Sequence, residues 1–132
     1  MIFGIQSRYA RDVWSRVEPL LNRLDSEDTG YTPEDILAAI ERQEMQLWIA
    51  GDFDAVGITF ISVKPQWKAL HIFYVCGDNM DVWLNEGLDV FEAYARYNHC
   101  KYVTEQGRKG WTRALKHRGY SEALVTTRRK VA

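Results

Sequence analysis

Apolar residues recur with the period of an α-helix in the first third of the chain. Over residues 9–24 they gather on one face of the expected helix: Val13, Trp14, Val17, Leu20, Leu21 and Leu24. Pro19 lies within this stretch, and we expect it to kink or divide the helix because proline lacks a backbone N–H. A second helix is expected after Thr32, whose hydroxyl can cap a helix that begins with Pro33. A short strand over residues 2–6 precedes both helices.

Farther along, the apolar period changes from that of a helix to that of a strand. Three strand-like runs follow one another, over residues 47–50, 55–63 and 69–76. Turn-forming residues separate them at 51–54 and 64–67. Because these connections are so short, we expect the three strands to form an antiparallel meander.

The last part of the chain returns to helices separated by short strands. The expected elements are a long helix that Asp78 or Asn79 caps and that ends near Asn98, a strand over 102–105, a helix over 111–118 ended by Gly119, and a final strand over 123–127. The order is therefore β-α-α-β-β-β-α-β-α-β. A meander followed by a strand–helix–strand crossover predicts an α/β (α+β) fold, with a mixed, mostly antiparallel sheet and helices on both faces. We expect residues 1–132 to form one domain.

Composition narrows the class of protein without identifying it. The chain is 46% hydrophobic and 13% aromatic, as globular domains are. It has no run of about 18 apolar residues and no signal-peptide pattern at its start, so we expect neither a membrane span nor export. Cys76 and Cys100 form neither a disulfide framework nor a metal-ligand spacing, and the three histidines are scattered. We therefore expect a cytoplasmic protein without a metal site.

Charge is distributed unevenly, although the net charge is only −1. Residues 101–132 hold nine Lys or Arg against two Glu, a balance of +7, so the first hundred residues carry −8. This asymmetry predicts an acidic partner for the C-terminal part, or self-association through unlike faces. A basic helix and tail that face solvent are the plainer interpretation.

The order of elements resembles that of the GNAT superfamily of N-acetyltransferases along nearly the whole chain. Residues 114–120, Ala-Leu-Lys-His-Arg-Gly-Tyr, are similar to the family's fourth helix and its closing Gly-Phe/Tyr. Residues 46–50, Gln-Leu-Trp-Ile-Ala, are similar to the family's second strand. The compact size and paired N-terminal helices also resemble GNAT-like proteins carried by tailed bacteriophages. That narrower resemblance implies the host cytoplasm or the virion as the location.

The resemblance implies acetyl-coenzyme A as the cofactor, held where the family's fourth and fifth strands part. The residues that would bind it, mainly through their backbone, are Val75, Cys76, Gly77, Asn79 and Met80. The family's loop pattern, Gln/Arg-x-x-Gly-x-Gly/Ala, is changed here. Gly77 is the only glycine of the loop, and Asp78 and Asp81 put negative charge where phosphates would lie. This change predicts weak coenzyme binding.

The proton donor that the resemblance implies is missing. The family often has a tyrosine four residues before the glycine that ends its fourth helix, and that position is Leu115 here. Glu105, at the end of an expected strand, is the candidate base, and Tyr120 is the candidate acid. Each has a structural alternative. Glu105 can form an ion pair with Lys101 or Arg108, and Tyr120 can make the hydrophobic contact that closes the helix.

Two further side chains allow a chemical and a structural interpretation. His71 alternates with its apolar neighbours and is a base if it faces the cleft, but a surface histidine is the plainer interpretation. Cys76 precedes a helix start, where the pKa of a thiol can fall, although a buried and inert thiol is the plainer interpretation.

A basic cluster with an aromatic residue lies before the C-terminus. It comprises Arg108, Lys109, Arg113, Lys116 and Arg118, beside Trp111. Such a cluster can bind coenzyme phosphates, nucleic acid or an acidic protein. Three functions therefore stay open. They are a GNAT-like accessory or assembly protein that has lost efficient acyl transfer, a divergent acyl-coenzyme A N-acyltransferase and, least favoured, a nucleic-acid binder.

Overall fold

A single mixed sheet forms the centre of the molecule in the computed structural model, which describes residues 1–107 and 109–131. Its strands are β1 (Ile2–Ile5), β2 (Gln46–Ala50), β3 (Ala55–Val63), β4 (Lys68–Gly77) and β5 (Tyr102–Glu105). They lie in the order β1-β2-β3-β4-β5, with every neighbouring pair antiparallel except the parallel pair β4–β5. The predicted antiparallel meander and the crossover to a parallel strand are confirmed.

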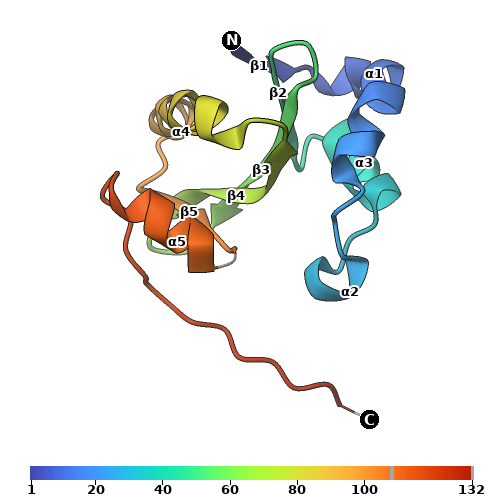
Figure 1. The fold of residues 1–132 in the computed structure, drawn as a ribbon. Helices are drawn as coiled ribbons and strands as arrows, with labels where there is room; N and C mark the ends of the chain where they lie inside the picture. The colour runs from blue at the N-terminus through green and yellow to red at the C-terminus, as the bar shows by residue number, and fades with distance from the viewer. Residues whose placement is uncertain (108, 132) are drawn as a thin grey trace.

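One face of the sheet is covered by the N-terminal helices (Figure 1). These are α1 (Ala10–Val17) and α3 (Pro33–Glu41); the four-residue α2 (Ser26–Thr29), which has no buried residue, lies between them in the chain. Pro19 divides the first helix, as predicted, because it lies in a separate 3₁₀ turn over Glu18–Leu21. The predicted cap of α3 is also confirmed: Asp35 N–H donates to Thr32 Oγ1 at 3.2 Å, and Thr32 N–H donates to Asp35 Oδ2 at 2.9 Å.

The other face is covered by α4 (Met80–Tyr97) and α5 (Lys109–Lys116). Leu88, Phe91 and Ala95 of α4 pack with Leu115 of α5 on side chains of β2 and β4. Asn79 precedes α4 in a left-handed conformation and makes no side-chain cap, so the cap predicted there is wrong for this residue. Gly119 ends α5 as predicted: its φ is +86°, and Tyr120 N–H donates to the Leu115 carbonyl at 3.3 Å. Among the described residues, no helix is long and apolar enough to cross a membrane.

A β-bulge interrupts β4 at Phe73. Ile58 of β3 is opposite Tyr74 and the adjacent Thr59 is opposite Ile72, which leaves Phe73 as the additional residue. Phe73 and Tyr74 consequently pack on the α1–α3 face, whereas Ile72 and Val75 pack on the α4–α5 face. The bulge lies where β4 loses its second neighbour.

The predicted final strand over 123–127 is wrong. Residues 121–131, called the C-terminal tail below, form no strand and are exposed along their length. In Figure 1 the tail runs from α5 away from the sheet. The prediction rested on Leu124, Val125 and two threonines, but a strand also needs a neighbour that pairs with its backbone, and the tail has none in this structure.

Candidate functional site

The parallel strands β4 and β5 are paired along only part of their length. Their register begins at Ala69–Tyr102 and ends at Ile72–Glu105, whereas β4 continues to Gly77. A cavity of about 350 Å³ lies where β5 has ended, bordered by β4, β5 and the first turns of α4. This is the place at which the sequence analysis expected two parallel strands to part.

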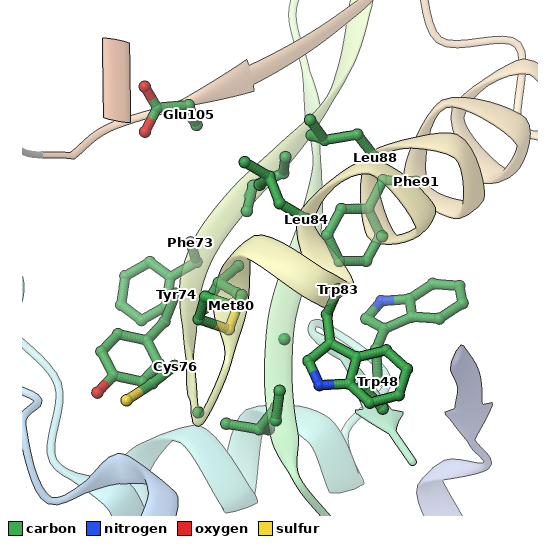
Figure 2. Close-up of a pocket in the computed structure, with 18 of the residues that line it drawn as sticks. Trp48, Phe73, Tyr74, Cys76, Met80, Trp83, Leu84, Leu88, Phe91 and Glu105 are labelled. Atoms are coloured by element: carbon green, nitrogen blue, oxygen red, sulfur yellow. The ribbon is translucent and has the colours of Figure 1, made fainter. Parts of the chain in front are cut away.

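Apolar and aromatic side chains form most of the cavity wall. Figure 2 shows Met80, Trp83 and Leu84 from the start of α4, with Leu88 and Phe91 one and two turns farther along. Trp48 from β2 also lines the cavity, and Tyr74 and Cys76 line it on the opposite side of β4. Such a wall favours a ligand with an apolar body and few charges.

The backbone of β4 faces this cavity at Val75. Asp78 N–H donates to the Asp54 carbonyl at 3.0 Å, and Gly77 is opposite Ala55 in the next position. In an antiparallel ladder, hydrogen-bonded and non-hydrogen-bonded pairs alternate. Val75 is therefore in a non-hydrogen-bonded pair with Gly57, and its N–H and C=O point away from β3, towards the side where β5 has ended. One backbone donor and one acceptor are thus directed at the cavity.

The residues predicted to bind a cofactor come together here, with one exception. Val75, Cys76, Gly77 and Met80 line the cavity, but Asn79 does not. Gly77 has φ +155°, and a Cβ at this position would overlap Ala55 of β3. The close packing of two strands is therefore sufficient to require this glycine, without a bound phosphate.

Glu105 lies at the end of β5, with its side chain on the cavity wall (Figure 2). Burial raises the pKa of its carboxyl above the ordinary range, because a partly dehydrated site disfavours the charged form. The ion pair with Lys101 that we considered is not formed in the described part of the chain, and Arg108 lies outside the described residues. A carboxyl in this position can accept a proton from a ligand or a water in the cavity.

The two positions considered for a proton donor differ in their surroundings. Leu115 lines the cavity and is buried, and its side chain has no proton to give. Tyr120 is not among the lining residues, and its hydroxyl donates to Glu92 Oε2 at 2.9 Å. Burial, followed by this hydrogen bond, raises the pKa of Tyr120 well above its ordinary value. A role for Tyr120 as an acid stays a prediction, and it requires that this hydrogen bond be given up.

The basic cluster is only partly available to a ligand. Arg118 forms ion pairs with Asp89 at 2.7 Å and Glu92 at 3.1 Å, so α4 already compensates its charge. Arg113 and Lys116 are exposed on α5. Arg108 and the side chain of Lys109 lie outside the described part of the structure.

His71 is not part of the cavity wall. Its Nδ1 lies 2.8 Å from Thr104 Oγ1 on the neighbouring strand, and its ring packs 4.9 Å from that of Phe60. Burial lowers the pKa of His71, which favours the neutral ring. Within the described residues, no three His, Cys, Asp or Glu side chains come together to hold a metal ion.

Sequence reasoning missed part of the wall. Trp48 and Trp83, which both line the cavity, were not among the candidate site residues. The sequence contains one signal that places Trp48 near the cavity. Trp48 alternates with Leu47 and Ile49 along β2, so its side chain lies on the opposite face of the sheet from theirs, the face that α4 and α5 cover.

Known structures provide a comparison for this architecture. A probable acetyltransferase superposes with a TM-score of 0.72 at 10% identity, covering 100% of this chain and 97% of that one. An acetyltransferase of Trypanosoma brucei gives 0.69 at 13% identity, covering 99% of each chain. Ribosomal-protein-alanine N-acetyltransferase of Brucella melitensis biovar Abortus gives 0.68 at 14% identity, covering 100% of this chain and 99% of that one.

Sequence comparison adds no closer relationship, since neither a protein-family model nor a curated protein sequence matches this chain. The structural similarity extends over the whole sheet and both helical layers, including the parallel pair β4–β5 that borders the cavity. The chain therefore has the GNAT-like acetyltransferase fold.

Proposed function

We propose that the protein binds an acyl thioester of the coenzyme A type in the cavity between β4 and β5, and that it transfers the acyl group slowly or not at all. The observation that carries this proposal is the outward N–H and C=O of Val75 beside an apolar cavity. A pantetheine arm is a narrow chain with two amides, and it can pair with such a strand edge as another strand would. The solved acetyltransferases of this fold support the same ligand class.

The chemistry available at the site is incomplete. Glu105 can take a proton from an amine, directly or through water, as the nitrogen attacks the thioester carbonyl and the C–S bond breaks. The departing thiolate then needs a proton, but Leu115 cannot donate and the Tyr120 hydroxyl is bonded to Glu92. Water must supply this proton, so we expect slow turnover.

This arrangement also supports a role in which binding matters more than catalysis. An accessory or assembly protein, such as the tailed-phage proteins that the sequence resembles, needs the cavity but not the proton donor. Efficient transfer of an acyl group from acetyl-coenzyme A to any amine would contradict this interpretation.

Binding can be tested separately from turnover by thermal shift and calorimetry with acetyl-coenzyme A and with acetyl-pantetheine, which lacks the nucleotide phosphates. A ligand at about 100 times its dissociation constant should stabilise the fold by about 2.7 kcal/mol. Because Asp78 and Asp81 are exposed at the start of α4, we expect the phosphates to add little affinity. No shift with either compound at millimolar concentration would overturn the proposal.

Val75→Pro tests the backbone contact directly, because it removes an N–H that β3 does not use. Val63→Pro is a matched control. Lys64 N–H donates to the Trp67 carbonyl, so the N–H of Val63 also points away from its partner strand, but at the far end of β3. We expect Val75→Pro alone to abolish the ligand-induced shift. Equal loss of binding in both variants would contradict the assigned contact.

A further inference from the structure

Two charged side chains line the cavity in the described part of the chain, Arg23 and Glu105. They approach it from opposite faces of the sheet. Glu105 is opposite Ile72, which packs on the α4–α5 face, whereas Arg23 follows the 3₁₀ turn that packs on the α1–α3 face. The gap that β5 leaves beside Val75 therefore has a carboxyl on one side and a guanidinium on the other.

Arg23 is held beside β4 by its neighbours in the chain. Leu21 is buried in the α1–α3 core, and Leu24 N–H donates to the Leu21 carbonyl at 3.0 Å, which closes a turn around Arg23. The Tyr74 hydroxyl of β4 donates to the Leu20 carbonyl at 3.5 Å. Burial raises the pKa of this hydroxyl, and the positive charge of Arg23 opposes the increase, which places the guanidinium near Tyr74.

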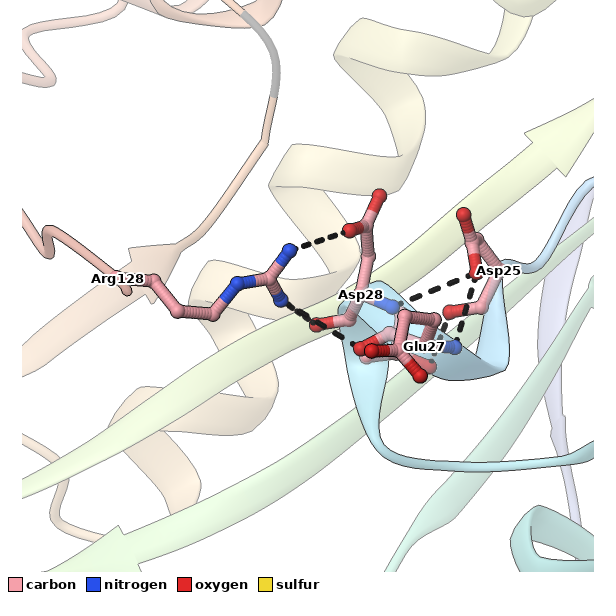
Figure 3. A network of polar contacts seen from close by, with 5 residues as sticks. Asp25, Glu27, Asp28 and Arg128 are labelled. Carbon is pink, nitrogen blue, oxygen red and sulfur yellow. Dashed lines mark hydrogen bonds and ion pairs between the residues drawn. The ribbon is translucent and has the colours of Figure 1, made fainter. Parts of the chain in front are cut away.

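The guanidinium of Arg23 makes no ion pair or hydrogen bond within residues 1–107 and 109–131. The two aspartates that follow it in the sequence are engaged elsewhere. Asp25 caps α2 by accepting from the N–H groups of Glu27 and Asp28 at 2.9 and 3.4 Å. Asp28 pairs with Arg128 of the C-terminal tail at 2.8 Å, and Arg128 also donates to the carbonyls of Glu27 and Asp28 (Figure 3). A guanidinium without an anion beside a cavity favours a ligand that has an anionic group.

The surroundings of Arg23 indicate which anion this is. Arg23 is the only basic side chain among the described residues that line the cavity, so a phosphate dianion would be only half compensated there. A planar carboxylate, in contrast, matches the parallel N–H groups of a single guanidinium. The wall beside it is aromatic, with Phe73 and Tyr74 together on the α1–α3 side of β4 (Figure 2). The ligand expected here has one carboxylate and an apolar body.

We propose that the acceptor of the acyl group is an amino acid with an apolar side chain, whose carboxylate binds Arg23 and whose amine enters the gap beside Val75. This inference rests on the proposed function, which puts the thioester at Val75. The amine nitrogen attacks the thioester carbonyl, so that the N–C bond forms and the C–S bond breaks. Glu105 takes the proton that the nitrogen gives up, and water protonates the thiolate. An amine without a carboxylate lacks the contact with Arg23 and binds more weakly.

Calorimetry on the full chain with L-phenylalanine and with L-phenylalaninamide tests the proposal, because the second compound has a neutral amide in place of the carboxylate. We expect the wild type to bind phenylalanine roughly tenfold or more tightly than the amide, the effect of one hydrogen bond to a charged group. Arg23→Gln should remove this preference and leave the affinity for the amide unchanged. Arg96→Gln is the matched control, since Arg96 is exposed on α4 and does not line the cavity.

Equal affinities of the wild type for the two compounds would overturn the proposal, and so would a preference that Arg23→Gln leaves intact. These measurements need no thioester, so they give their answer even where acetyl-coenzyme A does not bind and the proposed function fails. A thermal shift with acetyl-coenzyme A but no preference for the carboxylate would overturn this inference alone. If Arg23→Gln weakened acetyl-coenzyme A and not acetyl-pantetheine, Arg23 would bind the coenzyme phosphates, and the proposal would again be wrong.

Discussion

The hydroxyl of Tyr120 and the carboxylate of Glu92 are joined by a hydrogen bond of 2.9 Å between the end of α5 and the middle of α4. Glu92 also accepts from Arg118, so one carboxylate of α4 holds two nearby residues, Arg118 and Tyr120, of the segment that follows α5. This contact stabilises the packing of the two helices on the α4–α5 face of the sheet.

Tyr120→Phe should therefore lower stability by about 1 kcal/mol, the usual net contribution of one hydrogen bond. The melting temperature should fall by roughly 3–5 °C for a domain of this size. Tyr97→Phe, on an exposed residue of α4, should have no effect. Acyl transfer, where it can be measured, should be unchanged by Tyr120→Phe. A large fall in turnover without a fall in stability would instead identify Tyr120 as the acid.

Glu105→Gln should make the protein more stable than the wild type near neutral pH. Burial raises the pKa of Glu105, so the folded state holds its proton more tightly than the unfolded state. Wild-type stability is then highest below the ordinary pKa of about 4.3 and is partly lost as the pH rises through the raised value. Glutamine is neutral throughout and has no such loss.

Melting temperatures of the Glu105→Gln variant and the wild type from pH 4 to pH 8 check this prediction. The difference between the two should be small at the acidic end and should grow with pH. Glu122→Gln, on an exposed residue, is the control. A difference that does not change with pH would show that the carboxyl is not dehydrated in the folded state.

Thr59→Val should cost about 1–3 kcal/mol, although it replaces a hydroxyl with a methyl of similar size. Trp48 Nε1–H donates to Thr59 Oγ1 at 2.9 Å, and Thr59 is fully buried. Valine would leave the indole N–H without a partner. Thr59→Ser keeps the acceptor and should cost only about 1 kcal/mol for the lost methyl group. Urea denaturation compares the two variants, and equal losses would mean that the hydrogen bond contributes nothing.

Gly77→Ala should destabilise the fold far more than Gly30→Ala. Both glycines have positive φ, at +155° and +80°, so both substitutions bear a backbone cost of about 1 kcal/mol. At Gly30 a Cβ has no atom within 4 Å, whereas at Gly77 it overlaps the backbone of Ala55. Separation of β3 from β4 should add a further cost at Gly77. Similar melting temperatures for the two variants would contradict the close approach of these strands.

The parts of the fold that were predictable are those whose local pattern agrees with their final neighbours. β3 and β5 have the predicted bounds: β3 is an apolar run rich in β-branched residues between two turns, and β5 is a short Tyr-Val-Thr-Glu segment between two helices. The four-residue α2 was missed, although Asp25 caps it by accepting from Glu27 N–H at 2.9 Å and Gly30 ends it. It is too short to have an apolar period.

The candidate site was predictable only where it depends on the order of strands. The crossover from β4 to β5 placed Glu105 near the loop after β4, and the structure has both on one cavity. The bulge at Phe73 could not be predicted, because it follows from the number of residues on two paired strands rather than from one residue type. The ion pairs of Arg118 also depend on where α5 packs against α4, which the sequence does not state.

The bulge at Phe73 divides β4 into two segments that differ in the number of strands they pair with. The first segment is held by strands on both sides, whereas the second is held by β3 alone and contributes to the cavity. Substitutions after the bulge can therefore alter ligand preference without shifting the scaffold before it. A designer who wished to give this fold a new specificity would vary Val75 and Cys76 first and leave Ala69 to Ile72 untouched.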